Sequence, residues 1–404
     1  MVVCSSMPIV ETDTDNMIKH FLGGASLLAA SIAFAPYIAS ADPLQCLDNP
    51  SGASESFGYG IAATDGLILA GDPGANTVWA YERKSQGGWE LGAIRPPRNS
   101  QVADLGRGFG RSVAIDRDGG IVIGAYIEEA MGVTERKEPG DGFRRLGEIF
   151  VAEDISITPE KVPGLDSLTK TQALGFSVTR TQTDIALGLR TIRGENYGRT
   201  SVLLVDLEEG SQKRIQPTVN ESQVGFGYSL DSANGLVAIS ASWLEPAGGG
   251  VIYDIESHSR TVITPPKGME RTGFSIATDG DEVVLGGSST VTAHQSDGKW
   301  AVDYTLPQIN GVVAIAGDQT LTLKQPARAV ELGYDVNTAP LDLTLSNGEQ
   351  SETVRLADRG RYAERHWSRR DLAAFGDSAV ISRVTEVEDC NVSIVNLSNL
   401  DSGG

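Results

Sequence analysis

The chain has 404 residues, of which 53 are acidic and 33 basic, so its formal net charge is −20 at pH 7. Such an acidic balance argues against nucleic acid and anionic membranes as partners. Glycine is abundant, with 47 residues, whereas aromatic residues make up only 6%. This composition favours many short strands and turns over long helices, and we expect a mostly β protein.

The N-terminal region has the features of an export signal. Lys19 and His20 precede an apolar run over residues 21–38, and the small-residue triplet Ala39-Ser40-Ala41 follows. A basic start, an apolar stretch and an A-x-A site predict a secretory signal peptide that is cleaved after Ala41. A membrane anchor is the alternative, but the run is close to the minimum spanning length and contains Gly and Pro.

Residues 1–16 carry three acids and no base, which is the wrong charge for the start of a signal peptide. We therefore expect translation to begin at Met17, with the signal peptide over 17–41. The mature chain is then predicted to be exported to the periplasm, the cell surface or the medium, with no membrane span after cleavage.

A strand–turn–strand pattern recurs along the rest of the chain. It is visible in "SFGYGIAATDGLILAGDP", "GFGRSVAIDRDGGIVIGA" and "GFSIATDGDEVVLGG". Aligning its copies predicts seven units, with six or eight as alternatives, because the last two copies lose the Phe-Gly signature. The anchors of the seven units are Phe57, Phe109, Phe176, Phe226, Phe274, Val313 and Arg370.

Each unit contains the pattern of a four-stranded meander. A first strand with small residues at alternate positions is followed by a continuous apolar run such as "VVLGG", a third strand such as "GVIYDI", and often a fourth with Trp, as in "GKWAV". The middle strands are apolar on both faces and need neighbours on both sides. A ring of such sheets supplies them. The pattern thus predicts an all-β, seven-bladed β-propeller that forms a single domain over 42–404.

The order Phe-Gly, strand, acidic turn, apolar strand and "G-x-V-Y" resembles the FG-GAP repeat of integrin alpha-subunit propellers and many secreted proteins. The segment at 57–89 is the best single match, and the similarity extends over 56–397, weakly in the last two units. The resemblance implies a secreted, integrin alpha-like propeller with a role in protein binding or cell adhesion. It specifies a fold better than an activity.

Closure of the ring involves the two cysteines that signal cleavage leaves. The last unit is about one strand short, and the segment near 44–48 precedes the first unit with no partner of its own. If this segment supplies the outer strand of the last blade, Cys46 lies beside the strand that begins at Cys390. In an oxidising compartment the pair is predicted to form a disulfide, and two unpaired buried thiols are the alternative.

The acidic turns resemble, in part, the calcium loops of integrin alpha chains. "IDRDGG" contains Asp116 and Asp118, and "TDGDE" contains Asp279 and Asp281. Calcium needs six to eight oxygen ligands, and each turn offers two alternating carboxylates. Asp-Gly is also typical of a tight hairpin turn. We therefore interpret these residues as turn residues and expect no cofactor, with calcium at Asp116 and Asp118 as a weak alternative.

Catalytic motifs are scarce. After signal cleavage the histidines are His258, His294 and His366, without H-E-x-x-H or Cys-x-x-Cys spacing. No nucleophile elbow, phosphate-binding loop or dinucleotide fingerprint is present. His258 and His294 are interpreted as solvated residues at strand ends. His366, in the basic segment "RYAERHWSRR", is a candidate general base against the alternative of a capping segment.

The longest connections are predicted to gather on one face of the ring. Connections between the second and third strands and connections between blades emerge on the same side, which we call the long-loop face. The segments assigned to it are 95–107, 126–147, 160–173 and 190–199. The opposite side, with the turns between the first and second strands, is the short-turn face. Binding residues concentrate on loops that a rigid scaffold holds.

A basic patch is predicted on the long-loop face, where guanidinium groups would bind a carboxylate or sulfate. Its members are Arg144, Arg145, Arg190, Arg193, Tyr197 and Arg199. In the alternative interpretation these side chains are solvated and paired with nearby glutamates, namely Glu128, Glu129, Glu135 and Glu195.

Three functions are compatible with this sequence. The favoured one is a non-catalytic, monomeric interaction protein that holds a protein or a glycan on its long-loop face. The second is an extracellular hydrolase or lyase acting on polysaccharide, with carboxylate pairs such as Glu128 and Glu129 as candidates. The third is a purely structural envelope module.

Overall fold

The computed structural model divides by contacts into two units, Met1–Ala39 and Ser40–Gly404, and every residue described below belongs to the second. The structure describes residues 44–54, 56–130, 143–168, 172–191, 199–218, 225–269, 272–306, 311–324, 341–347, 350–357, 372–382 and 391–400. The predicted signal peptide and its cleavage site at Ala41 lie outside these ranges.

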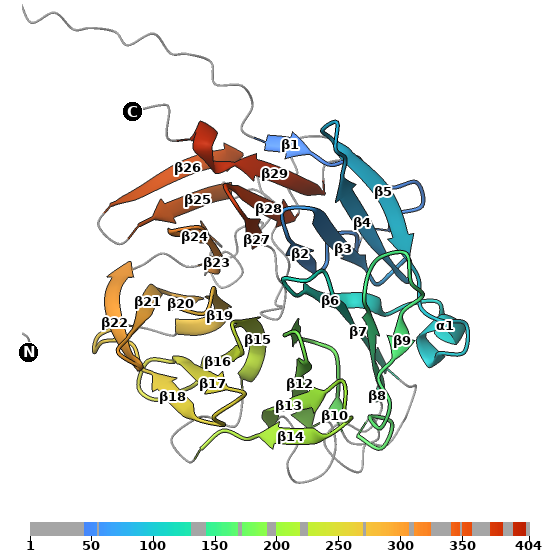
Figure 1. Cartoon of the computed structure of the whole chain (residues 1–404), viewed down its shortest axis with the longest axis horizontal. Coiled ribbons are helices and arrows are strands. Elements are labelled where there is room, and N and C mark those ends of the chain that lie inside the picture. Colours follow the sequence, from blue (N-terminus) through green and yellow to red (C-terminus); the bar gives the residue numbers. More distant parts are fainter. Residues whose placement is uncertain are drawn as a thin grey trace, which may run out of the picture. The chain divides into compact units, whose positions relative to one another are not determined.

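Seven antiparallel sheets are arranged in a ring around a central axis, as the sequence predicts (Figure 1). Consecutive strands pair in order from the centre outwards, so each sheet is a blade of a β-propeller. The first four blades contain β2 (Ile61–Ala63), β3 (Leu67–Asp72), β4 (Thr77–Arg83), β5 (Trp89–Ile94); β6 (Phe109–Ile115), β7 (Ile121–Ala130), β8 (Phe143–Ala152), β9 (Glu160–Lys161); β10 (Gln172–Ala173), β11 (Val178–Arg180), β12 (Asp184–Thr191), β13 (Thr200–Asp206), β14 (Gln212–Ile215); and β15 (Phe226–Ala233), β16 (Leu236–Ala241), β17 (Gly250–Asp254), β18 (Arg260–Ile263).

The remaining blades repeat the same order. They contain β19 (Thr272–Thr278), β20 (Glu282–Gly287), β21 (Thr290–Ser296), β22 (Lys299–Leu306); β23 (Gly311–Ala316), β24 (Gln319–Lys324), β25 (Leu341–Ser346), β26 (Ser351–Ala357); and β27 (Leu372–Phe375), β28 (Ser378–Ser382), β29 (Val392–Asn396), with a 3-10 turn η2 (Leu397–Asn399) after it.

The ring closes through its first strand. β1 (Leu44–Cys46) pairs antiparallel with β29 and completes the seventh blade, so the predicted closure is confirmed (Figure 1). Cys46 lies opposite Ser393 in this register. Cys390 lies outside the described residues, and its bridge to Cys46 stays a prediction.

Two blades depart from the predicted meander. In the third blade β10 and β11 both pair with β12, so its innermost position is divided between two short segments. In the second blade, β7 continues as far as Ala130 and β8 begins at Phe143. Much of the predicted loop over 126–147 is therefore strand. The register sets Glu128 opposite Arg145 and Glu129 opposite Arg144. Opposite charges across an antiparallel ladder favour strand extension, a cue that the loop assignment overlooked.

A short helix, α1 (Gln101–Leu105), lies in the connection between the first two blades, where the sequence predicts only a loop. The Ser100 hydroxyl caps its N-terminus by accepting from the Ala103 amide, and Gly106 ends it with a left-handed φ. The buried Glu148 carboxylate accepts a hydrogen bond from the Val102 amide at 3.0 Å and so ties the helix to β8. Within the described residues, neither helical segment has the length and hydrophobicity that a membrane crossing requires.

The hydrophobic core lies between neighbouring sheets rather than in one centre. Between the first two blades, Leu69 and Val78 pack against Ile121 and Phe150, and all four are fully buried. This two-sided burial explains why the middle strands read as continuous apolar runs.

The repeated Phe-Gly signature has a backbone cause. In five blades a glycine near the start of the innermost segment adopts a left-handed φ between 75° and 85°. At Gly110 an added Cβ would lie 2.9–3.1 Å from Val78, the Thr77 carbonyl and Gly71, so only glycine fits. The five glycines are Gly58, Gly110, Gly175, Gly227 and Gly273.

These glycines correct the repeat alignment. Phe57, Phe109 and Phe226 precede their glycine and are fully buried, whereas Phe176 and Phe274 follow theirs. Aligning the phenylalanines therefore placed two different positions in one column. The residues that follow the glycines, which we call the mouth ring, are Tyr59, Arg111, Phe176, Tyr228 and Phe274.

The small residues of the innermost strands link neighbouring blades. The Ser112 hydroxyl donates to the Gly175 carbonyl of the next blade at 2.9 Å, and the Ser177 hydroxyl donates to the Gly227 carbonyl at 2.6 Å. In the following blades, Ser275 accepts from the Val313 amide at 3.1 Å. The predicted small residues near the axis thus also supply a chain of hydrogen bonds around the channel.

Candidate functional site

The channel contains a cavity of about 160 Å³ between the innermost strands. Most of its wall consists of Ala, Val and Ile side chains, and its polar groups include Asp231 and Thr278. Asp231 accepts a hydrogen bond from the Thr278 amide at 2.9 Å, so this carboxylate already joins two blades. The cavity thus combines apolar side chains with polar groups that add substantially to its exposed wall.

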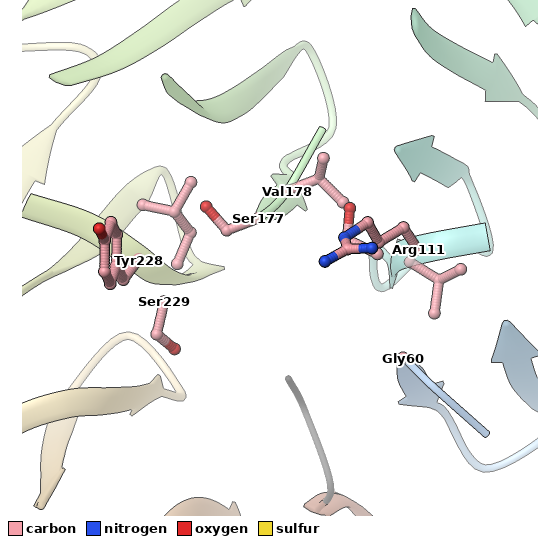
Figure 2. Close-up of a pocket in the computed structure, with 9 residues that line it drawn as sticks. Gly60, Arg111, Ser177, Val178, Tyr228 and Ser229 are labelled. Atoms are coloured by element: carbon pink, nitrogen blue, oxygen red, sulfur yellow. The ribbon is translucent and has the colours of Figure 1, made fainter. Parts of the chain in front are cut away.

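At the end where the innermost strands begin, a smaller hollow opens, which we call the mouth. Gly60, Arg111, Ser177, Val178, Tyr228 and Ser229 surround it (Figure 2). The hollow has a volume of about 10 Å³, roughly the space of one water molecule. The connections between blades lead into these strand starts, so the mouth belongs to the long-loop face.

Arg111 is the cationic residue of the mouth. Its guanidinium carbon lies 4.8 Å from the ring centre of Tyr59 and 5.1 Å from that of Tyr126. Both tyrosines are buried, and cation–π attraction draws the guanidinium to their rings. Among the described residues, the buried Nε atom of Arg111 has no hydrogen-bond partner and no carboxylate forms an ion pair with this arginine.

The other side of the mouth is aromatic. Phe176 and Tyr228, from the third and fourth blades, meet edge to face with ring centres 5.7 Å apart. Tyr228 is half-buried and lines the hollow opposite Arg111 (Figure 2). The lining of the mouth therefore combines one cation, Arg111, with one aromatic side chain, Tyr228.

The short-turn end of the channel is bridged. Arg117, in the turn after β6, donates to the Asn234 side-chain oxygen at 2.7 Å and to the Asp279 carbonyl at 2.9 Å. The Asn234 amide donates to the same carbonyl at 3.2 Å. The second and fifth blades lie on opposite sides of the ring, so this arginine crosses the channel (Figure 1).

Asp116, a weak calcium candidate, acts in its own turn and in a buried ion pair. One carboxylate oxygen accepts from the amides of Asp118 and Gly120, and the other lies 2.8 Å from the Arg180 guanidinium. Arg180 also donates to the carbonyls of Ile121 and Ala152. Among the described residues no group of three His, Cys, Asp or Glu side chains is arranged for a metal ion.

A second polar cluster joins the fifth and sixth blades near the short-turn face. Glu282 accepts a hydrogen bond from the Thr320 hydroxyl at 3.1 Å, and its carboxylate lies 3.6 Å from His294, which also contacts Asp303. Burial raises the pKa of Glu282, and His294 opposes this shift. His294 is thus paired with carboxylates, which the sequence interpretation as a solvated strand end did not anticipate.

Asp279 has the role of a turn residue, as the sequence predicts. The Asp279 carboxylate accepts from the amides of Asp281 and Glu282 at 2.9 and 2.7 Å.

His258 occupies a turn with φ of 58°, and its ring stacks on Tyr253. His366 lies outside the described residues.

The structure describes only part of the predicted basic patch. Arg190 is the penultimate residue of β12 and is exposed, and Arg199 is exposed just before β13. Arg193 and Tyr197 lie outside the described residues. Arg144 and Arg145 are placed by the β8 backbone alone, opposite glutamates in β7. The patch stays a prediction.

Sequence reasoning missed Arg111. The signal was available, because alignment on the glycines gives a column with four aromatic residues and one arginine. Alignment on phenylalanine concealed this column.

Comparison with known proteins supports the fold. No protein-family model matches the sequence, and no curated protein matches it. The chain is similar to a solved structure, the β-propeller domain of Cps50 (Swd1) from Myceliophteria thermophila, with a TM-score of 0.51 and 10% identity. The match covers 88% of this chain and 99% of that domain. At this identity the likeness concerns architecture, and together with the seven sheets it identifies the chain as a seven-bladed β-propeller.

Proposed function

We propose that this protein is an exported, non-catalytic interaction protein that holds a partner protein on the long-loop face of the propeller. The observation that carries the proposal is the difference between the two ends of the channel. Arg117 joins three blades across the short-turn end, whereas Arg111 at the mouth has hydrogen-bond donors that no described residue uses. Unused donors on a rigid scaffold are suited to an external partner.

Kinship with FG-GAP repeat proteins is part of the proposal. The left-handed glycines supply a physical reason for the Phe-Gly signature in the repeated units. The predicted Cys46–Cys390 bridge also fits an exported protein, because β1 closes the ring beside β29. Mass spectrometry of a digest without reduction should find the linked peptides. Two free thiols in exported protein would contradict this bridge.

Binding is tested by presenting the purified propeller to envelope and secreted proteins and to a glycan array, followed by titration of each purified hit. Two substitutions then assign the face. Arg199→Glu changes the long-loop face, and Asp281→Lys changes an exposed turn on the short-turn face. We expect the first to weaken binding and the second to leave it unchanged. The reverse result would overturn the assignment, and a polysaccharide activity screen tests the hydrolase or lyase alternative.

A further inference from the structure

The guanidinium of Arg111 contacts two aromatic rings but forms no hydrogen bond with a described residue. The guanidinium lies over the rings of Tyr59 and Tyr126. Such stacking leaves the N–H groups at the edge of the guanidinium plane for hydrogen bonding. Within the described chain these groups form no hydrogen bond or ion pair, although the Nε atom is buried. The terminal N–H groups of the guanidinium, rather than the buried Nε, are the donors that a ligand entering from solvent can reach.

The backbone around Arg111 is preorganised. The register between β6 and β7 shifts between Phe109 and Ser112, so Gly110 and Arg111 form a bulge. Bulges redirect side chains, and this one turns Arg111 into the hollow (Figure 2). The Ser112 hydroxyl fixes the following residue to the third blade. A partner therefore meets a guanidinium whose orientation folding has already set.

We propose that Arg111 binds a carboxylate on a peptide segment of the partner protein, a side chain of Asp or Glu that enters the mouth from the long-loop face. This inference rests on the proposed function and names the chemistry of its ligand. The planar fork of a guanidinium matches a carboxylate with two parallel hydrogen bonds. One cation also balances one carboxylate, whereas a phosphate dianion would leave excess negative charge on a protein whose net charge is −20.

The size of the hollow favours a peptide over an acidic sugar. A space of about 10 Å³ between Arg111 and Tyr228 admits the tip of a slender side chain but not a pyranose ring. The hydroxyl hydrogen of Ser177 is engaged by the Gly227 carbonyl, so Arg111 is the cationic donor that the ligand meets, beside the hydroxyls of Tyr228 and Ser229.

The acidic surface does not prevent this contact. Charges farther away than about 8 Å are largely screened at physiological ionic strength, so the pairing at the mouth is governed by its immediate neighbours. Long-range repulsion instead slows the approach of an acidic partner. We therefore expect selective binding of moderate affinity rather than fast, steered association.

The probe for this inference is a displayed library of random heptapeptides, selected on the intact purified protein. Enriched peptides are synthesised with a fluorescent label, each with a matched variant in which Asp or Glu becomes Asn or Gln. The protein variants are Arg111→Gln, Arg111→Lys and the control Arg98→Gln. Arg98 is exposed in the connection before α1, so its replacement removes one positive charge from the same face.

We expect an acidic residue at one position of the enriched peptides. Arg111→Gln should weaken their binding about tenfold or more, the effect of losing a charged hydrogen bond. Arg111→Lys should restore only part of it, because an ammonium lacks the planar fork. Arg98→Gln should change affinity less than twofold. Neutralising the peptide should have no further effect on the Arg111→Gln protein.

The outcomes separate the two proposals. Peptides that bind equally well with and without an acid, and equally to Arg111→Gln, overturn the carboxylate inference and leave binding on the long-loop face standing. Displacement of the peptide by oligoglucuronate or inorganic phosphate at lower concentration than by a free acidic peptide assigns the mouth to those anions instead. Failure of the library, the envelope proteins and the glycan array alike to yield a ligand overturns both proposals.

Discussion

Two arginines on neighbouring blades show how differently the ends of the channel use positive charge. Arg180, near the short-turn end, is buried against Asp116 and donates to two backbone carbonyls. Arg111, at the mouth, contacts two tyrosine rings and leaves its hydrogen-bond donors without partners among the described residues. The first arrangement stabilises the ring and the second is suited to an external anion. Which arginine serves folding and which serves binding can therefore be measured.

The largest difference should come from removing each arginine. Arg180→Gln leaves the buried Asp116 carboxylate without its cation, and loss of one partner of such a pair costs about 3–5 kcal/mol. Arg111→Gln breaks no hydrogen bond within the described chain and should lower the free energy of unfolding by about 1 kcal/mol or less. Denaturant titration measures both. Equal losses in the free energy of unfolding would show that Arg111 stabilises the fold as much as Arg180 does.

A second contrast compares two glycines with similar φ. Gly110 at the mouth and Gly119 in the short turn have φ of 85° and 89°, but only at Gly110 would a Cβ meet neighbouring atoms. Gly119→Ala should cost about 1–2 kcal/mol from the left-handed backbone. Gly110→Ala should cost about 1–3 kcal/mol more because of overpacking. Thermal unfolding compares the two, and indistinguishable losses would disprove the close packing of the mouth backbone.

The buried carboxylate near the short-turn face predicts a pH dependence. Burial raises the pKa of Glu282 in the folded state. Its contribution to stability is therefore fully present below the unfolded-state pKa and is lost as the pH rises through the folded-state pKa. Glu282→Gln can still accept from Thr320, so it should gain stability relative to the native protein between pH 4 and pH 7.5. Asp281→Asn, an exposed neighbour, controls for net charge, and a gain on acidification would contradict the prediction.

The smallest effect should follow from opening the bridge across the short-turn end. Arg117→Gln removes exposed hydrogen bonds to Asn234 and Asp279, and exposed pairs contribute about 1 kcal/mol or less. We expect faster amide exchange in the turns at these two residues with little change in global stability. Exchange that instead accelerates at the mouth would mean that the two ends are coupled.

Much of the fold followed from local patterns. Period-2 strands, apolar middle strands and acid-glycine turns were enough to predict the blades, and a missing last strand indicated that residues near 44 would close the ring. The errors have physical causes. Phe176 and Phe109 look alike in sequence, but the glycine geometry puts them in different columns. The hairpin of β7 and β8 read as a loop because its residues are charged.

The candidate site was less accessible to such reasoning. Nothing near Arg111 in the sequence shows that its guanidinium contacts tyrosine rings from two separate segments. Nor does it show that Asp116 forms an ion pair with Arg180 rather than with Arg111. The cluster of Glu282, His294 and Thr320 likewise combines three strands from two blades.

By itself, the sequence determined the repeating blade and predicted seven copies with six or eight as alternatives, because hydrophobic periodicity and glycine conformation act within a few residues of chain. Only the tertiary structure decided which charges are satisfied. Ion pairs and hydrogen-bond partners across the channel depend on how seven blades converge on one axis, and this convergence brings together residues from separate repeats. The Arg111 guanidinium at the mouth, whose Nε has no hydrogen-bond partner among the described residues, is a consequence of that geometry.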